Sequence, residues 1–390
     1  MNNGCRLMAS SLTISRRRQR ASAEGIFRFG IEEEYFLADA ETLRPPRRTP
    51  DGLFKQLAGS EICLRRELLQ SQIEVATRPH DTIRAARDEL KLLRNATSDA
   101  SSKYGLKILA CGTSPLAEWR RSVHSPKRRY EKMMDDLQML ARRNMLCGMH
   151  VHVELPDPSR RVEIMARMLR YIPVLLALST SSPFWEKCPT GLMGYRLTAY
   201  DELPRTGLPE LFATEGEFEE YVGAMQRSDA IADASHLWWS IRPSPKYPTL
   251  ELRATDCCTR MEDALAIASL YRVLVRHLYR CPDVNADVGV IDRALALENK
   301  WRAQRFGSAA SFVTREGAVS LADTLRQLFV LVEPDADVLG CLDALDHCQG
   351  IIAGGTSADA QLRIFGQHAA REPNAALVAV AGWIAEATLA

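Results

Sequence analysis

Acidic side chains stand at positions in the sequence where they could bind a divalent cation. Glu32-Glu33-Glu34 lies in a segment rich in β-branched and aromatic residues, which is typical of a strand. Because alternate strand residues face opposite sides, Glu32 and Glu34 share one face and Glu33 points away. A hard cation such as Mg²⁺ prefers carboxylate oxygens and would relieve the repulsion between Glu32 and Glu34. The alternative is an exposed acidic edge, which many proteins have.

Two further glutamates, Glu67 and Glu74, are seven residues apart. A straight strand would therefore put them on opposite faces. Both can point to the same side only if Glu67 lies in the loop before the strand or if the strand has a bulge. By periodicity alone, the simpler interpretation is one solvated glutamate and one salt-bridged glutamate.

A third group combines histidines with a carboxylate. His150, His152 and Glu154 alternate with apolar residues and share one strand face. The H-x-H pattern is compatible with zinc, with Glu154 as the one nearby candidate for a third ligand. A half-buried strand whose histidines are hydrogen-bonded explains the pattern equally well, and both interpretations stay open here.

A carboxylate and a guanidinium share a face further along the chain. Glu251 and Arg253 alternate with Leu250 and Leu252. A simple ion pair would explain this; alternatively, Glu251 binds a metal and Arg253 a phosphate, for which the guanidinium fork is suited. The sequence has neither G-x-x-x-x-G-K-[ST] nor G-x-G-x-x-G. The phosphates of a nucleotide would therefore be held through metals and arginines.

The elements that must position these residues alternate irregularly. Strand patterns cover residues 27–37, 106–112, 147–155, 236–242 and 249–256, and residues 67–77 are typical of a loop followed by a strand. Helical patterns cover residues 81–104, 128–143, 158–178, 218–230 and most of the chain after residue 260. Asp81 or Thr82 could cap the first of these helices, and Pro173 is expected to kink the third. Residues 191–214 are typical of a loop. This order predicts an α+β fold with an antiparallel β-sheet and flanking helices, rather than a doubly wound parallel sheet.

The composition excludes several classes of function. Among 390 residues, 50 basic side chains balance 49 acidic ones, so the overall charge does not indicate a nucleic acid or membrane partner. The longest apolar runs are far shorter than the roughly 20 residues that span a bilayer. None of the ten cysteines forms a C-x-x-C pair, which favours reduced thiols in a cytoplasmic protein. Residues 1–25 are predicted to be a disordered basic tail, with a transit peptide as the alternative.

Five segments that occur in order carry a family resemblance. They are F-G-I-E-E-E (29–34), E-L-L-Q-S-Q-I-E-V-A-T (67–77), C-G-M-H-V-H-V (147–153), R-P-S-P-K-Y-P-T-L-E-L-R-A-T-D (242–256) and E-N-K-W-R-A-Q-R-F-G (298–307). The sequence resembles the bacterial carboxylate–amine ligase family, also called type 2 glutamate–cysteine ligases, over residues 27–370. The resemblance implies a glutamine-synthetase-like catalytic fold whose antiparallel sheet forms a metal-lined funnel. It also implies that residues 26–390 form one catalytic domain with a helical C-terminal third.

The resemblance also assigns roles to residues of this chain. Arg253 would be the catalytic arginine at the transferred phosphoryl group, and Arg196 would hold the acid substrate, with Arg242 as a further substrate-binding candidate. Two positions depart from the family pattern: Gln70 replaces an acid, which would lower the charge of one metal site, and Ser240 replaces an aspartate. The implied ligands of Mg²⁺, or alternatively of Mn²⁺, are Glu32, Glu34, Glu67, Glu74, His150 and Glu251.

The implied activity is ATP-dependent amide formation through an acyl phosphate. ATP would be a co-substrate, the acid would be glutamate-like, and the amine would be cysteine or another amine. A cytoplasmic location is expected, and a homodimer is left open. Two other functions remain: a metal-dependent hydrolase built on His150 and His152, which would act without ATP, and a catalytically silent relative, which would bind ligand without turnover.

Overall fold

An antiparallel sheet lies at the centre of the protein. The structure, a computed structural model, describes residues 26–57, 62–368 and 372–390, so the predicted basic tail at 1–25 lies outside the described residues. The strand order is β2-β3-β1-β5-β9-β8, and β4 also pairs with β1. The strands are β1 (Phe29–Asp39), β2 (Arg65–Arg66), β3 (Gln72–Ala76), β4 (Leu106–Leu109), β5 (Met149–Glu154), β8 (Ile241–Pro243) and β9 (Thr249–Leu252). The predicted α+β fold with an antiparallel sheet is confirmed.

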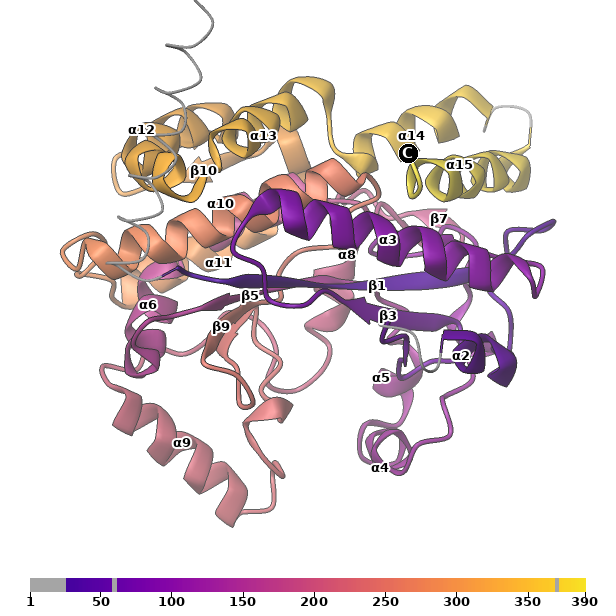
Figure 1. The fold of residues 1–390 in the computed structure, drawn as a ribbon, viewed down its shortest axis with the longest axis horizontal. Coiled ribbons are helices and arrows are strands. Elements are labelled where there is room, and N and C mark those ends of the chain that lie inside the picture. The colour runs from indigo at the N-terminus through magenta and orange to yellow at the C-terminus, as the bar shows by residue number, and fades with distance from the viewer. Residues whose placement is uncertain (1–25, 58–61, 369–371) are drawn as a thin grey trace, which may run out of the picture.

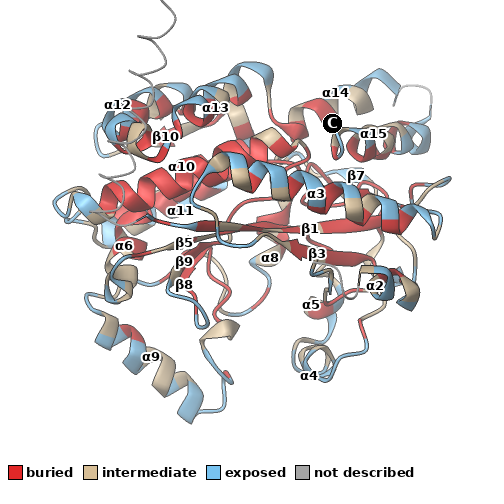
Figure 2. Cartoon of the chain, in the orientation of Figure 1, coloured by how far each residue is buried: buried red, intermediate tan, exposed pale blue. Residues whose placement is uncertain are grey.

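Helices cover one face of this sheet in two layers (Figure 1). The inner layer contains α3 (Ile83–Ser102), which packs on β1, and α10 (Met261–Arg280), which packs on β5. Buried residues follow the sheet and α10, which is buried around most of its circumference (Figure 2). The remaining helices on this side are α11 (Val290–Phe306), α12 (Leu321–Leu339), α13 (Leu342–Gly354), α14 (Ser357–His368) and α15 (Pro373–Ala387), with the hairpin β10 (Ser311–Val313) and β11 (Ala318–Ser320).

The other face of the sheet carries shorter and more exposed elements. Helix α4 exposes or half-exposes all of its residues, and Phe218 is the one buried residue of α9. In Figure 1, α4 and α9 lie below the sheet and apart from each other. The helices α6 (Arg161–Met168) and α7 (Ile172–Ser179) instead pack against α10, and α7, all of whose residues are buried, also packs against α11. The other elements are α2 (Asp51–Leu57), α4 (Arg128–Leu137), α5 (Met139–Arg142), α8 (Tyr195–Tyr200), α9 (Glu215–Arg227), β6 (Phe184–Trp185) and β7 (Cys188–Pro189).

Local signals explain most element boundaries, and three expectations were wrong. Thr82 caps α3 as expected, and Pro173 stands in the first turn of α7, which separates it from α6. The helix expected at 128–143 breaks at Gln138, which has a φ of 50°. The strand expected at 236–242 begins only at Ile241, because a 3₁₀ turn capped by Asp233 precedes it. The loop expected at 191–214 contains α8. No helix within the described ranges is both long and apolar enough to cross a membrane.

Glu33 points to the helical side of the sheet, as its position in the strand predicted. It is fully buried, and Arg94 of α3 pairs with both of its carboxylate oxygens at 2.5 and 2.9 Å. The hydroxyl of Tyr35 donates to the same carboxylate, and Arg94 also donates to the carbonyls of Cys258 and Thr388. This ion pair therefore joins β1, α3, the start of α10 and the C-terminus.

Replacing Arg94 with methionine should destabilise the fold by about 3–5 kcal/mol, because the charge of Glu33 would stay buried without a partner. Urea unfolding measures this loss. A matched control on the same helix is R87M, since Arg87 and Glu262 form an ion pair in which both side chains are about half exposed. That substitution should cost less than about 1 kcal/mol. Similar losses in the two variants would show that burial of the Glu33 pair does not matter.

Candidate active site

The strand register alone brings site residues together on the open face of the sheet. Glu34 on β1 is opposite Glu74 on β3, and Glu32 is opposite His150 on β5. In the same way, Glu251 on β9 is opposite both His152 on β5 and Arg242 on β8. Residues directly opposite each other on antiparallel strands point to the same side. Seven polar side chains from five strands, Glu32, Glu34, Glu74, His150, His152, Arg242 and Glu251, therefore form one continuous row.

A cavity of about 560 Å³ lies over this row. Its other walls come from Glu67, helices α4 and α8, and the segment between Ser235 and Tyr247. The structure places every residue that was predicted for metal, substrate or phosphoryl binding at this one cavity: Glu32, Glu34, Glu67, Glu74, His150, Arg196, Arg242, Glu251 and Arg253.

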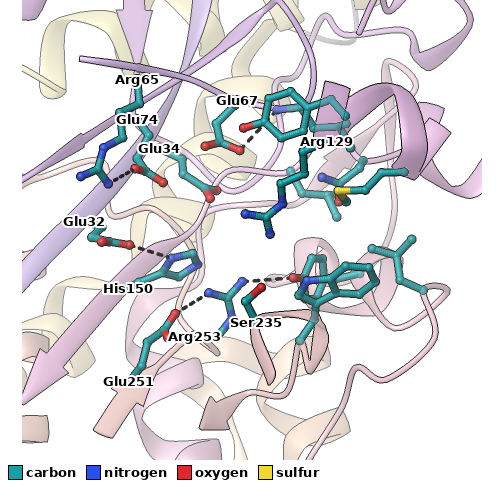
Figure 3. Close-up of a pocket in the computed structure, with 18 of the residues that line it drawn as sticks. Glu32, Glu34, Arg65, Glu67, Glu74, Arg129, His150, Ser235, Glu251 and Arg253 are labelled. Atoms are coloured by element: carbon teal, nitrogen blue, oxygen red, sulfur yellow. Dashed lines mark hydrogen bonds and ion pairs between the residues drawn. The ribbon is translucent and has the colours of Figure 1, made fainter. Parts of the chain in front are cut away.

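Three carboxylates converge at one end of the cavity (Figure 3). Glu34, Glu67 and Glu74 each offer an oxygen, and these oxygens lie within 4.8 Å of one another. Glu67 belongs to the loop between β2 and β3, which is the arrangement that its seven-residue spacing from Glu74 required. One cation compensates part of this charge: Nη1 of Arg65 lies 2.9 Å from Oε1 of Glu74.

The environment of these carboxylates opposes their ionisation. Burial, together with the charges of Glu74 and Glu34, raises the pKa of Glu67 well above its usual range. Burial and the charges of Glu32 and Glu34 raise the pKa of Glu74 to about 7, although Arg65 acts in the opposite direction. The raised pKa values show that too little positive charge surrounds these carboxylates to balance their negative charge. A bound divalent cation would supply that positive charge.

The raised pKa of Glu74 predicts that the metal-free protein loses stability as the pH rises. The folded state binds more protons than the unfolded state between the two pKa values, so the free energy of unfolding falls with pH there. For Glu74 this window runs from its ordinary pKa of 4.5 to about 7. Denaturant unfolding in EDTA across this range should show the decline, and E74Q should make it shallower. If the free energy of unfolding fell equally steeply with pH in the wild type and in E74Q, Glu74 would not be the cause of the decline.

Glu32 lies between the two histidines of β5. One of its oxygens is 3.5 Å from Nδ1 of His150, and the other is 3.7 Å from Nε2 of His152. Burial would raise the pKa of Glu32, but its interactions with His150 and His152 hold that pKa well below its usual range. Burial and the charge of Arg253 lower the pKa of His150, and its buried Nε2 has no hydrogen-bond partner among the described residues. His150 thus presents a nitrogen that could bind a cation.

Glu251 is the centre of an arginine cluster at the other end of the cavity. Nε and Nη2 of Arg242 donate to its two oxygens at 2.8 and 3.2 Å, and Nη1 of Arg253 donates to Oε1 at 2.5 Å. Burial would raise the pKa of Glu251, but the charges of Arg253 and Arg242 hold it well below its usual range. Arg253 also donates to the hydroxyl of Tyr200 at 3.2 Å. The ion pair between Glu251 and Arg253, which was one of the two interpretations of the sequence, is present, and both residues line the cavity.

Arg196 differs from its expected setting. It lies on the short helix α8 rather than in a loop, and 2% of its surface is exposed. Its Nη1 donates to the carbonyls of Arg253 and Thr255, so backbone groups hold the guanidinium in place. These partners come from a segment about 57 residues away, which is why spacing in the sequence could not show them.

The two departures from the family pattern lie away from the cavity. The side chain of Gln70 accepts from the backbone of Thr49 and donates to the carbonyl of His124, and it does not line the cavity. An effect of Gln70 on the charge of a metal site stays a prediction. Ser240 is buried and also lies outside the cavity wall.

Two further residues of the cavity, Arg129 and Tyr200, have no signal in the sequence. Arg129 on α4 directs its guanidinium between the acidic cluster and Arg253 (Figure 3), and it forms no hydrogen bond or ion pair with another described residue. Tyr200 of α8 orients Arg253. Both lie on short elements without a motif, and the helical pattern around Arg129 was assigned without any role for its charge.

The comparisons with known proteins agree with this geometry. Residues 28–379 match the family described as glutamate–cysteine ligase family 2. The chain belongs to this family. A protein of Bradyrhizobium diazoefficiens named "Putative glutamate--cysteine ligase 2" is 51% identical over 366 residues, which covers 93% of this chain and 84% of the relative. A protein of the same name from Rhodospirillum rubrum is 40% identical and covers 94% and 97% of the two chains. Membership of glutamate–cysteine ligase family 2 confirms an ATP-dependent ligase that joins a carboxylate to an amine.

Solved structures support the fold of this family member. The glutamate–cysteine ligase of Francisella tularensis, solved in complex with AMP, matches with a TM-score of 0.67 and 15% identity, over 94% of this chain and 90% of the other. A bifunctional glutathione synthetase of Pasteurella multocida matches with a TM-score of 0.68 and 14% identity, over 96% of this chain and 55% of that protein. At these identities the likeness concerns the fold alone.

Proposed function

We propose that this ligase uses ATP to activate a glutamate-like acid as an acyl phosphate, which an amine such as cysteine then attacks. The observation that carries this proposal is the single cavity in which the carboxylates of Glu34, Glu67 and Glu74 lie across from Arg253. One end of the cavity attracts cations and the other holds a fixed positive charge. This arrangement suits the transfer of a phosphoryl group between two anions.

The donor set of the cavity fits Mg²⁺, with Mn²⁺ as an alternative. The raised pKa values of Glu67 and Glu74 indicate missing positive charge, and Nε2 of His150 is buried without a partner. Glu34, Glu67 and Glu74 would hold the ion, with Glu32 and His150 beside them. Glu251 remains the sixth proposed ligand, although arginines occupy its oxygens here. When bound, Mg²⁺ would neutralise the phosphate charge and orient the transferred group.

Arg253 would stabilise the charge that develops on the transferred phosphoryl group. Its guanidinium is fixed at one side by Glu251 and at the other by Tyr200, so it needs no reorganisation when the charge appears. Arg129, which extends into the same space, would contact the anion from the opposite wall.

Arg196 would bind the free carboxylate of the acid. Its Nη1 is engaged by two carbonyls, whereas its Nη2 has no hydrogen-bond partner among the described residues and Nε is buried without one. A carboxylate accepts from two guanidinium nitrogens at once. Arg242, which pairs with Glu251 and lines the same cavity, is the second proposed contact to substrate.

The proposed reaction has two balanced steps. A carboxylate oxygen of the acid attacks the γ-phosphorus of ATP, and ADP leaves. The amine nitrogen then attacks the acyl carbon and loses a proton, and phosphate leaves with the oxygen that came from the acid. Because the acyl phosphate would react with water, water must be kept from the cavity until the amine attacks.

ADP release across a panel of acids and amines tests this proposal. We expect ADP only with Mg²⁺ or Mn²⁺ and a suitable acid, and hydroxylamine should trap the activated acid as a hydroxamate. Turnover of a substrate that continues without nucleotide would favour the hydrolase built on His150 and His152. ATP binding without ADP release from any acid would favour a catalytically silent relative.

The setting of the reaction is part of the same proposal. ATP and reduced cysteine are cytoplasmic metabolites, so we propose a cytoplasmic location. A homodimer stays a prediction, which the molar mass in solution would test.

A further inference from the structure

Gly148 lies where the acidic cluster and Arg196 meet. Its N–H donates to Oε2 of Glu34 at 2.6 Å, and its carbonyl accepts from the N–H of Glu34 at 3.1 Å. On its other side, a Cβ added to Gly148 would lie 2.1 Å from Nη2 and 2.7 Å from Cζ of Arg196. Distances below 3.0 Å are essentially never found for real Cβ atoms. The guanidinium of Arg196 therefore occupies the space that a side chain at position 148 would need.

The conformation of the backbone does not require glycine at this position. Gly148 does not have a positive φ. It forms an antiparallel bridge with Asp256, which extends the pairing of β5 with β9 by further residues. An alanine could adopt the same backbone. What the structure needs at position 148 is the empty space.

Arg196 can avoid an added side chain in few directions. The N–H of Arg196 donates to Oγ of Ser182 at 2.9 Å, and this hydroxyl donates to the buried carboxylate of Asp256 at 2.6 Å. The start of α8 is therefore anchored in the core. Since the carbonyls of Arg253 and Thr255 lie behind the guanidinium, the direction left for it is into the cavity.

We propose that Gly148 is a specificity-determining residue that sets the length of the acid substrate, an inference that rests on the proposed role of Arg196. The missing side chain lets the guanidinium of Arg196 lie back against Gly148 while it still lines the cavity. The distance between its free Nη2 and the acidic cluster then accommodates an amino dicarboxylic acid of the length of glutamate. A side chain at position 148 pushes the guanidinium forward and favours the shorter aspartate.

The test is a double-mutant cycle with G148A, R196K and the double variant. G148A should raise the KM for glutamate by about tenfold or more, since it disrupts charge-assisted hydrogen bonds of Arg196. The ratio of kcat/KM for aspartate to that for glutamate should rise, and the KM for ATP should stay the same. In the R196K background, G148A should have a smaller effect, because lysine lacks Nη2, the atom that would lie nearest to the added Cβ. The matched control is G30A on β1, where an added Cβ meets its nearest atoms at 3.7 Å.

Each outcome of this cycle bears on a separate claim. Independent effects of G148A and R196K would overturn the proposed action of Gly148 through Arg196. An unchanged glutamate KM in R196K would instead remove the acid-binding role of Arg196 from the proposed function. If G148A does not fold, the G148A/R196A variant should fold again, because alanine lacks every atom of Arg196 that would meet the added Cβ. Failure of that rescue would also overturn the inference.

Discussion

Replacing Arg253 with alanine should lower turnover by on the order of 10²–10³ while ATP binds almost as tightly as before. The guanidinium is needed most when charge develops on the transferred phosphoryl group, so its loss affects kcat more than nucleotide affinity. The fold should survive, because Glu251 keeps both hydrogen bonds from Arg242. Steady-state kinetics and a direct ATP-binding measurement separate the two effects.

The lysine variant of Arg253 serves as the control for charge. R253K keeps a cation but loses the fork that reaches Glu251 and Tyr200 together, so its turnover should lie between those of the wild type and R253A. Near-normal turnover in R253A would show that Arg253 is only a structural partner of Glu251.

Replacing Glu67 with glutamine should have a comparably large effect, through the metal. Metal ions supply several kcal/mol of charge stabilisation, so we expect turnover at fixed Mg²⁺ to fall on the order of 10². The Mg²⁺ concentration for half-maximal activity should rise. In contrast, the metal-free variant should be more stable than the wild type above neutral pH, because one of three crowded carboxylates is gone.

In E67Q, turnover should fall while the stability of the metal-free protein rises, and these opposite signs distinguish a binding site from a structural cluster. A structural carboxylate would lose stability and activity together, whereas a binding site is commonly destabilising by itself. E154Q is a suitable control, because Glu154 lies on β5, pairs with Arg28 and does not line the cavity. A metal-free E67Q protein that is less stable than the wild type, with an unchanged Mg²⁺ requirement, would contradict the assignment.

Strand periodicity predicted the faces of the site but not its neighbours. The two-residue repeat placed Glu32 and Glu34 on one side and Glu33 on the other, and the structure confirms this through the ion pair of Glu33 with Arg94. Periodicity within one strand carries no information about which strand lies beside it. The alignment of Glu34 with Glu74 and of Glu32 with His150 depends on pairings between distant segments.

The residues outside the sheet were harder to predict. Glu67 reaches the cluster from a loop, for which the sequence alone offered two geometries. Arg196 was expected in a loop, but it lies on α8, where long-range contacts with Ser182 and Thr255 fix it. Arg129 lies on α4, where no residue is buried, so the hydrophobic pattern gave no reason to select it.

The most direct test of the acyl phosphate follows the oxygen of the acid. The enzyme would turn over glutamate carrying ¹⁸O in its side-chain carboxylate, with ATP, Mg²⁺ and the amine, and the products would be analysed by mass spectrometry. We predict ADP as the nucleotide product and one ¹⁸O atom in each inorganic phosphate released. Label in AMP would indicate transfer of an adenylyl group instead, and amide formation with unlabelled phosphate would contradict the acyl phosphate.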